Sequence, residues 1–236
     1  PIQIWNPGSP EFSIVATPIL AVPHIGILPN SPFGGANVAK LQNSTTSNGL
    51  MTRLSTIVPV TLANTLFQIA YAGSWDGVHE CCGSPGFRIN VYTCTNGSFT
   101  PIPCGDFNLS PNCPNVANGY TITNGVYWTN WNIKNIDLSA YIGQCIKISI
   151  LCADCAYSGH HGCAFIDARC GTQALVGWNS AVIPNTVNYC AGSNQAVIAA
   201  PSGFSSYQWI APGGASVSAP SGIAPTLTVS LPVPGS

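Results

Sequence analysis

The chain has very little charge. Only 6 Lys or Arg and 7 Asp or Glu occur in 236 residues, a charged fraction of 6 %, where ordinary soluble domains have roughly 25 %. A net charge of −1 provides no basic patch for nucleic acid or anionic lipid. We therefore expect no nucleic-acid partner, and a surface covered mainly by uncharged polar side chains.

Long apolar runs and helical spacing are also missing. No apolar segment reaches the roughly 18 residues that a membrane-spanning helix needs, so we expect no membrane insertion. One turn at residues 137–141 is the only hint of a helix. The hydrophobic content of 46 % is nevertheless ample for a packed core, which argues against disorder.

Most of the titratable side chains fall into two short runs. The first contains Asp76, His79, Glu80 and Arg88, and the second, within residues 152–170, contains Asp154, His160, His161, Asp167 and Arg169. The second run also holds four cysteines. Any chemistry in this chain is therefore expected in these two runs.

Cysteine is abundant, with 11 residues beside a single Met. Without an array of metal-finger spacings, this number is typical of a protein that folds outside the cell in an oxidising compartment. We expect disulfides among the ten cysteines that precede residue 171, and their connectivity is open: Cys81, Cys82, Cys94, Cys104, Cys113, Cys145, Cys152, Cys155, Cys163 and Cys170.

Three pairing expectations follow from position. Cys94 and Cys104 flank the Asn96-Gly97 turn and are favoured as a local bridge. The adjacent Cys81 and Cys82 point to opposite faces of an extended chain, so they need different partners, sought among Cys152, Cys155, Cys163 and Cys170. Cys190 stands alone in the last part of the chain, and we expect its partner beyond residue 236 of a longer protein.

Short apolar segments separated by turn residues predict an all-β fold. Asn-Gly pairs at residues 96–97, 118–119 and 124–125 are typical of hairpin turns. The pattern favours an antiparallel β-sandwich or jelly roll. The main strands are expected at residues 37–41, 51–60, 66–71, 87–92, 128–136, 146–151 and 164–168.

The same pattern divides the chain into four parts. Residues 1–35 are rich in Pro and Gly and form a lead-in segment that can contribute an edge strand, and residues 36–172 form the disulfide-rich sandwich. Residues 173–188 form a linker. Residues 189–236 begin an incomplete immunoglobulin-like sandwich with Trp209 on its central strand.

Five segments occur in a characteristic order along the chain: Met51-Thr-Arg-Leu-Ser55, Phe67-Gln-Ile-Ala-Tyr-Ala72, Gly86-Phe-Arg-Ile-Asn-Val91, residues 136–144 and residues 154–170. Together they resemble a jelly-roll module of large secreted Bacteroidetes proteins, including gliding-motility-associated surface adhesins exported by type IX secretion. The tail, with Tyr189-Cys-Ala-Gly-Ser193 and residues 202–209 and 227–236, resembles the PKD-like or immunoglobulin-like repeats that follow such modules. Cysteines 81, 82, 145, 152 and 163 depart from the usual pattern of the module.

This resemblance implies a structural and adhesive, non-catalytic module of a long cell-surface protein or fibre. Its partners would be neighbouring domains of the same chain, surface glycans or like subunits. Such modules occur in adhesins, enzymes and filament proteins alike, so the fold by itself does not define a function. The alternative that we keep is a glycan-binding, lectin-like domain.

Two kinds of metal site are considered. Cys152, Cys155, His160 and Cys163 approach the spacing of a zinc knuckle, but cysteines in an exported protein favour disulfides over zinc. Calcium would need oxygen ligands, and the candidates are Asp76, Glu80, Asp154 and Asp167. Because no dense Asp-x-Asp loop is present, we favour pairing of these carboxylates with Arg88 and Arg169 over a calcium site. No cofactor other than calcium is expected.

Catalysis is not expected. His160 and His161 near Asp154 and Asp167 would offer a base and its orienting group, with Ser158 or a cysteine as nucleophile. However, no Gly-x-Ser-x-Gly or His-Glu-x-x-His motif supports an enzyme.

Sugar stacking on aromatic rings is the more plausible activity. Trp75, Trp128 and Trp131, with Tyr127 and nearby asparagines, offer the rings and hydrogen-bonding groups that glycan sites use. The competing interpretation places Trp128 and Trp131 in the core or at a seam.

Overall fold

The computed structural model describes residues 12–22, 24–42, 51–77, 79, 85–102, 105–110, 120–153, 155, 160 and 162–171, and seven short strands between residues 174 and 230. Their regular structure is β-strand, apart from the 3-10 turn at Ser139–Tyr141 and a 3-10 conformation at Gly105. Within this part of the chain, no helix is long and apolar enough to cross a membrane. The all-β prediction is confirmed.

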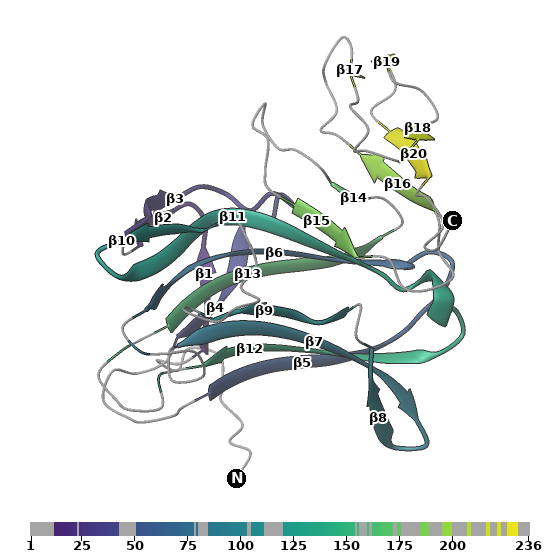
Figure 1. Cartoon of the computed structure of the whole chain (residues 1–236), viewed down its shortest axis with the longest axis horizontal. Helices are drawn as coiled ribbons and strands as arrows, with labels where there is room; N and C mark the ends of the chain where they lie inside the picture. Colours follow the sequence, from purple (N-terminus) through teal and green to yellow (C-terminus); the bar gives the residue numbers. More distant parts are fainter. Residues whose placement is uncertain are drawn as a thin grey trace.

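Two sheets face each other across the core (Figure 1). The first contains, in spatial order, β1 (Phe12–Ala16), β4 (Asn37–Gln42), β13 (Gly162–Gly171), β6 (Leu66–Asp76), β11 (Val126–Asp137) and β10 (Thr121–Thr123). The second contains β5 (Met51–Pro59), β12 (Cys145–Ala153), β7 (Gly86–Thr95) and β8 (Ser98–Pro101), with β9 (Phe107–Leu109) also on β7.

The connections between these strands are those of a jelly roll. Going along the chain, β4, β6, β11 and β13 belong to the first sheet, whereas β5, β7, β9 and β12 belong to the second. The chain therefore passes between the sheets at almost every connection, and the resulting spatial orders are β4-β13-β6-β11 and β5-β12-β7-β9. All neighbours in these two orders are antiparallel. Eight antiparallel strands in this arrangement confirm the predicted jelly-roll β-sandwich.

Two of the predicted turns set the register of hairpins. Asn96 and Gly97 have φ values of 50° and 79° and join β7 to β8, and Asn124 and Gly125, at 52° and 79°, join β10 to β11. Two successive residues with positive φ form the tight turn that matches the twist of paired strands, and Asn-Gly adopts it at the lowest cost. These hairpins are therefore encoded locally.

The core between the sheets is built from alternate residues of the strands. Trp75, Phe87 and Ile136 are fully buried there, and the Tyr71 ring stacks on Phe87 with centroids 5.4 Å apart. Because successive strand residues point to opposite faces, one apolar residue in two is enough to fill this layer.

A second apolar cluster covers the outer face of the first sheet. The hairpin of β2 (Ile19–Val22) and β3 (Gly26–Leu28) contributes Val22 and Leu28, which pack with Trp131 and Phe165 of the sheet. Between Thr129 and Asn132 the pairing of β11 with β6 shifts register, and Trp131 lies in this irregular stretch. Such bulges change the direction of a side chain, here towards the hairpin.

The first sheet extends beyond the predicted limits of the sandwich, residues 36–172, at both ends. β1, within the lead-in segment of residues 1–35, pairs with β4 at the sheet edge, so this segment is part of the sheet. β15 (Asn185–Asn188), within the predicted linker, pairs in parallel with β11. Backbone pairing with an open strand edge explains both additions. The edge strand in residues 1–35 was among the sequence expectations, whereas the pairing of β15 with β11 was not.

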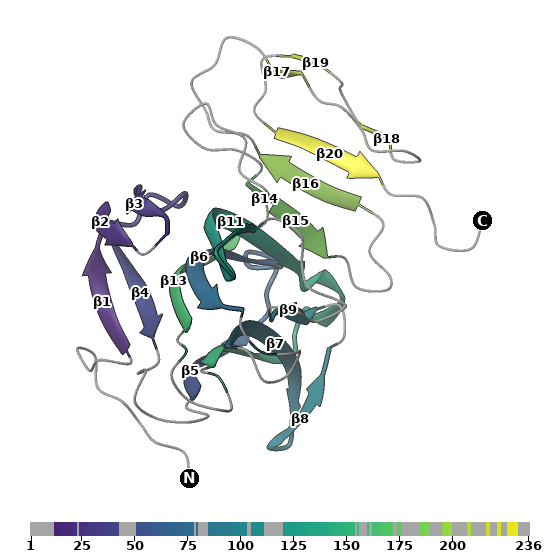
Figure 2. The ribbon, with the colours of Figure 1, turned by 60° about the vertical axis from the view of Figure 1, so that its left-hand side comes forward.

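The last part of the chain forms short strands of its own. β14 (Ala174–Leu175), β16 (Gln195–Ala199), β20 (Thr226–Ser230) and β18 (Ser216–Val217) make a small sheet, in which β16 and β20 lie side by side (Figure 2). β17 (Tyr207–Gln208) pairs with β19 (Ser221–Gly222). Cys190 and Trp209, on which the immunoglobulin-like prediction rested, lie outside the described residues.

Candidate functional site

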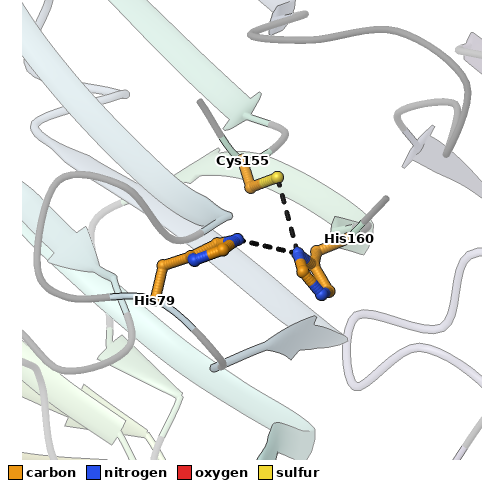
Figure 3. A group of neighbouring side chains, drawn as sticks. All are labelled: His79, Cys155 and His160. Carbon is orange, nitrogen blue, oxygen red and sulfur yellow. Dashed lines mark hydrogen bonds between the residues drawn. The ribbon is translucent and has the colours of Figure 1, made fainter. Parts of the chain in front are cut away.

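Three side chains with metal-binding atoms meet at one end of the sandwich: His79, Cys155 and His160 (Figure 3). His79 follows the end of β6, Cys155 follows the end of β12, and His160 precedes β13. In the first sheet Gly162 of β13 stands opposite Trp75 of β6, so the end of β6 and the start of β13 lie at the same edge. The topology thus brings together residues that are far apart in the sequence.

The donor atoms of these three residues are close to one another. His79 Nε2 lies 2.9 Å from His160 Nδ1, and Cys155 Sγ lies 3.7 Å from the same nitrogen. All three donor atoms lie within 4.8 Å of one another. The imidazole rings meet edge to face at 75°, and Cys155 is buried whereas both histidines are half-buried.

This donor set has a definite chemical preference. Imidazole nitrogen and thiolate sulfur are ligands for Zn²⁺ and other borderline or soft metal ions, whereas Ca²⁺ and Mg²⁺ require oxygen ligands. Without a metal, the two imidazoles can share one hydrogen bond, in which one nitrogen donates and the other accepts. The arrangement can therefore hold a metal ion or form a hydrogen-bonded pair.

A second pair of reactive groups lies on the opposite sheet. Cys94 of β7 stands directly opposite Cys145 of β12, and both thiols are free and half-exposed. Burial, a hydrogen bond with Cys145 and the neighbouring Cys145 thiol together raise the pKa of Cys94 to about 11. Opposite residues of antiparallel strands have Cα atoms about 4.5–5.5 Å apart, within the range that a disulfide spans.

The outer face of the second sheet carries an unusual share of the charge. Arg53 of β5 and Arg88 of β7 are exposed and both stand opposite Leu151 of β12, one on each side. Lys147 stands opposite Tyr92 on the same face, with its Nζ 4.2 Å from the centroid of the Phe99 ring. Three of the 6 Lys or Arg of the chain thus lie on one sheet face.

No protein-family model and no curated protein matches the chain. Among solved structures, the chain is similar to TmCBM61, which was determined in complex with beta-1,4-galactotriose. The TM-score is 0.34 at 12 % sequence identity, and the match covers 70 % of this chain and 86 % of that one. A likeness of this size supports no functional conclusion for this chain.

The four residues whose spacing approaches a zinc knuckle, a site that the sequence favours less than disulfides, do not come together as a set. Cys152 is buried in the core between the sheets, whereas Cys163 lies in the cluster on the outer face of the first sheet. Burial raises the pKa of the Cys163 thiol to about 11, which disfavours its thiolate. Cys155 and His160 do come together, with His79 as their third neighbour. Sequence spacing could not identify His79, although it belongs to the first titratable run.

The two described calcium candidates, Asp76 and Asp167, are not brought together, and a calcium site formed with Glu80 or Asp154 stays a prediction. Asp76 ends β6, one residue beyond Trp75, which stands opposite Gly162, whereas Asp167 lies five residues further along β13. Asp167 stands opposite Ala70, six residues before Asp76 on β6, so at about 3.3 Å per residue roughly 20 Å separates the two positions, too far for one ion. The Asp167 carboxylate accepts a hydrogen bond from Ser31 and acts electrostatically on Arg169, whose Nε donates to Gln68 Oε1, so direct pairing of Asp167 with Arg169 stays a prediction. Glu80 and Asp154 lie outside the described residues.

The catalytic combination of His160 with Asp167 is not formed either. His160 contacts His79 and Cys155 and precedes β13, whereas Asp167 lies five residues beyond Gly162 along that strand. Ser158, His161 and Asp154 lie outside the described residues.

Two of the three tryptophans proposed to stack on sugars are buried. Trp75 is 0 % exposed in the core, and Trp131 is 4 % exposed at the seam with the β2–β3 hairpin, so neither offers a ring face to a ligand. Alternation along β6 and the bulge in β11 explain these positions. Trp128 is half-buried, and its indole N–H donates to Thr123 Oγ1 at 3.0 Å.

Of the remaining disulfide candidates, Cys170 is exposed and has a free thiol, as does the buried Cys163. Cys81, Cys82, Cys104 and Cys113 lie outside the described residues. The pairing of Cys94 with Cys104 therefore stays a prediction, and Cys145 is a competing partner of Cys94.

Proposed function

We propose that the chain is a non-catalytic structural module of an extracellular cell-surface protein, in which the jelly roll serves as a rigid, stapled unit. The single observation that carries this proposal is the placement of Cys94 opposite Cys145. The resemblance to Bacteroidetes surface adhesins is in accord with it, and neighbouring modules of a longer chain are its proposed partners.

The chemistry of the staple is thiol–disulfide exchange. A small-molecule or protein disulfide accepts two electrons from the two thiols of Cys94 and Cys145, a new S–S bond forms, and the oxidant leaves as two thiols. The bridge would join two adjacent strands of the second sheet and close a loop whose ends are 51 positions apart in the sequence (145 − 94). The chain-entropy model assigns about 4 kcal/mol of stabilisation to a loop of this length.

Limited proteolysis of oxidised and reduced protein tests the staple. We expect the oxidised form to resist thermolysin longer, and the double variant Cys94→Ser, Cys145→Ser to be cleaved at the rate of the reduced form. Cys170→Ser is the matched control, since its exposed thiol lies on another strand. Equal digestion of oxidised protein and double variant would contradict the proposal, as would any enzymatic turnover abolished by His160→Ala.

A second candidate function is the binding of an acidic polysaccharide, which concerns the outer face of the second sheet. The observation that favours it is the presence on this face of Arg53 and Arg88, which flank Leu151, and of Lys147 opposite Tyr92, in a chain that has few other cations. Arginine pairs with carboxylate or sulfate groups in a bidentate manner, and a tyrosine ring can stack on a sugar.

A glycan array containing uronate and sulfated sugars tests this candidate. Binding that falls in Arg53→Gln and Arg88→Gln, but not in Lys40→Gln on the first sheet, would support it. An array without any hit, or binding to neutral sugars that survives both arginine variants, would contradict it.

A further inference from the structure

We propose that His79, Cys155 and His160 bind a Zn²⁺ ion. This inference goes beyond the structural role proposed above and does not depend on the Cys94–Cys145 staple, which lies on other residues. The ion would connect the segment after β6 with the segment between β12 and β13, two parts of the chain that approach each other at one end of the sandwich.

The distances between the donor atoms are close to those around zinc. Bonds of about 2.05 Å to nitrogen and 2.3 Å to sulfur, at tetrahedral angles, place two nitrogens about 3.3 Å apart and a nitrogen and a sulfur about 3.6 Å apart. The corresponding separations are 2.9 Å between His79 Nε2 and His160 Nδ1, and 3.7 Å between Cys155 Sγ and His160 Nδ1. The sulfur already has the required spacing from His160 Nδ1, the two imidazoles need to separate by about 0.4 Å, and all three donor atoms lie within 4.8 Å of one another.

The surroundings of the three residues suit a metal of this class. Cys155 is buried, which limits access of solvent to the metal–sulfur bond, whereas the half-exposed histidines leave a path by which an ion enters. The two rings meet edge to face, and His79 Nε2 faces His160 Nδ1 (Figure 3). Three protein ligands leave one tetrahedral position for water or for another ligand.

Binding changes the protonation of the site in a defined way. Zn²⁺ takes the thiolate of Cys155 and the neutral form of both imidazoles, so one proton leaves the thiol when the Zn–S bond forms. The proton shared between His79 Nε2 and His160 Nδ1 must leave this pair of atoms as well, because both nitrogens now donate their electron pairs to the metal. Affinity should therefore weaken as pH falls and the ligands become protonated.

A competition titration against a chromogenic chelator tests the site directly. Protein is first stripped of metal with EDTA and reduced, then titrated with Zn²⁺, and parallel samples receive Co²⁺ as a spectroscopic probe. We expect one equivalent of Zn²⁺ to bind, and the Co²⁺ form to show the near-ultraviolet absorption of a thiolate–cobalt bond. Native mass spectrometry counts the bound ions.

Variants assign the ligands. His79→Gln, Cys155→Ser and His160→Gln should each weaken Zn²⁺ binding. Loss of an outer-shell partner lowers metal affinity roughly 10–100-fold, and we expect loss of a direct ligand to lower it further. Only Cys155→Ser should also abolish the thiolate–cobalt absorption. The matched controls are His24→Asn, at an exposed histidine with φ of 62°, a conformation that Asn tolerates, and Cys170→Ser at an exposed thiol.

Two results would overturn the proposal. One is Zn²⁺ affinity that is the same in the three ligand variants as in the two controls. The other is peptide mapping that finds Cys155 in a disulfide in the native protein while His79 and His160 bind no metal. Far-ultraviolet circular dichroism of each variant separates loss of a ligand from loss of the fold. Because the titration uses reduced protein, its outcome is independent of whether Cys94 and Cys145 form a bridge.

Discussion

Trp131 donates its indole N–H to the main-chain carbonyl of Pro29, with 2.9 Å between nitrogen and oxygen. This bond ties the segment after β3 to the bulge of β11, across 102 positions of the sequence. The Trp131 side chain, which the sequence offered for sugar stacking, is thereby part of the seam between the β2–β3 hairpin and the first sheet.

The Trp131–Pro29 bond can be tested by removing only the donor. Trp131→Phe should lower the free energy of unfolding by about 1–2 kcal/mol, because the Pro29 carbonyl loses its partner in a largely buried seam. Trp128→Phe, at a half-buried ring bonded to an exposed hydroxyl, should cost less than about 0.5 kcal/mol. Urea denaturation of both variants provides the comparison, and an equal cost in the two would contradict the assignment of Trp131 to the seam.

Gly73 allows the close approach of β6 to β13. A Cβ atom at this position would lie 2.1 Å from the carbonyl oxygen of Cys163 and 2.8 Å from the Trp75 ring. Gly73→Ala should therefore destabilise the fold by about 3 kcal/mol or more through steric overlap with backbone that cannot move aside. Gly171→Ala is the control, because the nearest atom to its Cβ is 3.9 Å away in Gln68. A similar melting temperature for both variants would show that the strands have room to separate.

Lys134 has a buried ammonium group. Its side chain is 6 % exposed, with Nζ 5.4 Å from the centroid of the Phe107 ring, and burial lowers its pKa from 10.5 to about 8. Between these two pH values the unfolded chain binds a proton that the folded chain does not, so this group makes stability rise with pH. After allowance for solvent screening, we expect this group to raise the free energy of unfolding by about 2 kcal/mol from pH 8 to pH 10.5.

The variant Lys134→Met isolates this contribution, because other titrating groups cancel in the difference between the two proteins. The free energy of unfolding of the wild-type protein, relative to the variant, should increase over this pH interval. Chemical denaturation at pH 7, 8, 9 and 10 measures it, and a difference that is flat with pH would contradict the buried position of the ammonium group.

Local features of the fold could be predicted from the sequence. The Asn96-Gly97 and Asn124-Gly125 turns and the alternating pattern of residues 51–60 are sufficient to place hairpins and strands, because turn conformation and burial depend on neighbouring residues. Strand β2 and the pairing of β15 with β11 were not predicted. They depend on an exposed sheet face and an open strand edge, which exist only after the sheet has formed.

The candidate sites depend on register between distant strands. His79 joins Cys155 and His160 because Gly162 stands opposite Trp75, and Cys94 faces Cys145 because nine residue pairs of β7 and β12 lie in one register. A shift of one residue in either pairing would turn these side chains to the opposite face. Sequence spacing alone therefore favoured residues that are close along the chain, namely Cys104 as the partner of Cys94 and Cys163 as a neighbour of Cys155 and His160.

The most direct test of the structural-module account is peptide mapping of the protein after oxidative folding, digested without reduction and with free thiols alkylated. The account predicts a linked peptide pair that contains Cys94 and Cys145, which lie opposite each other in the second sheet. A bridge between Cys94 and Cys104, or complete alkylation of both Cys94 and Cys145, would contradict it.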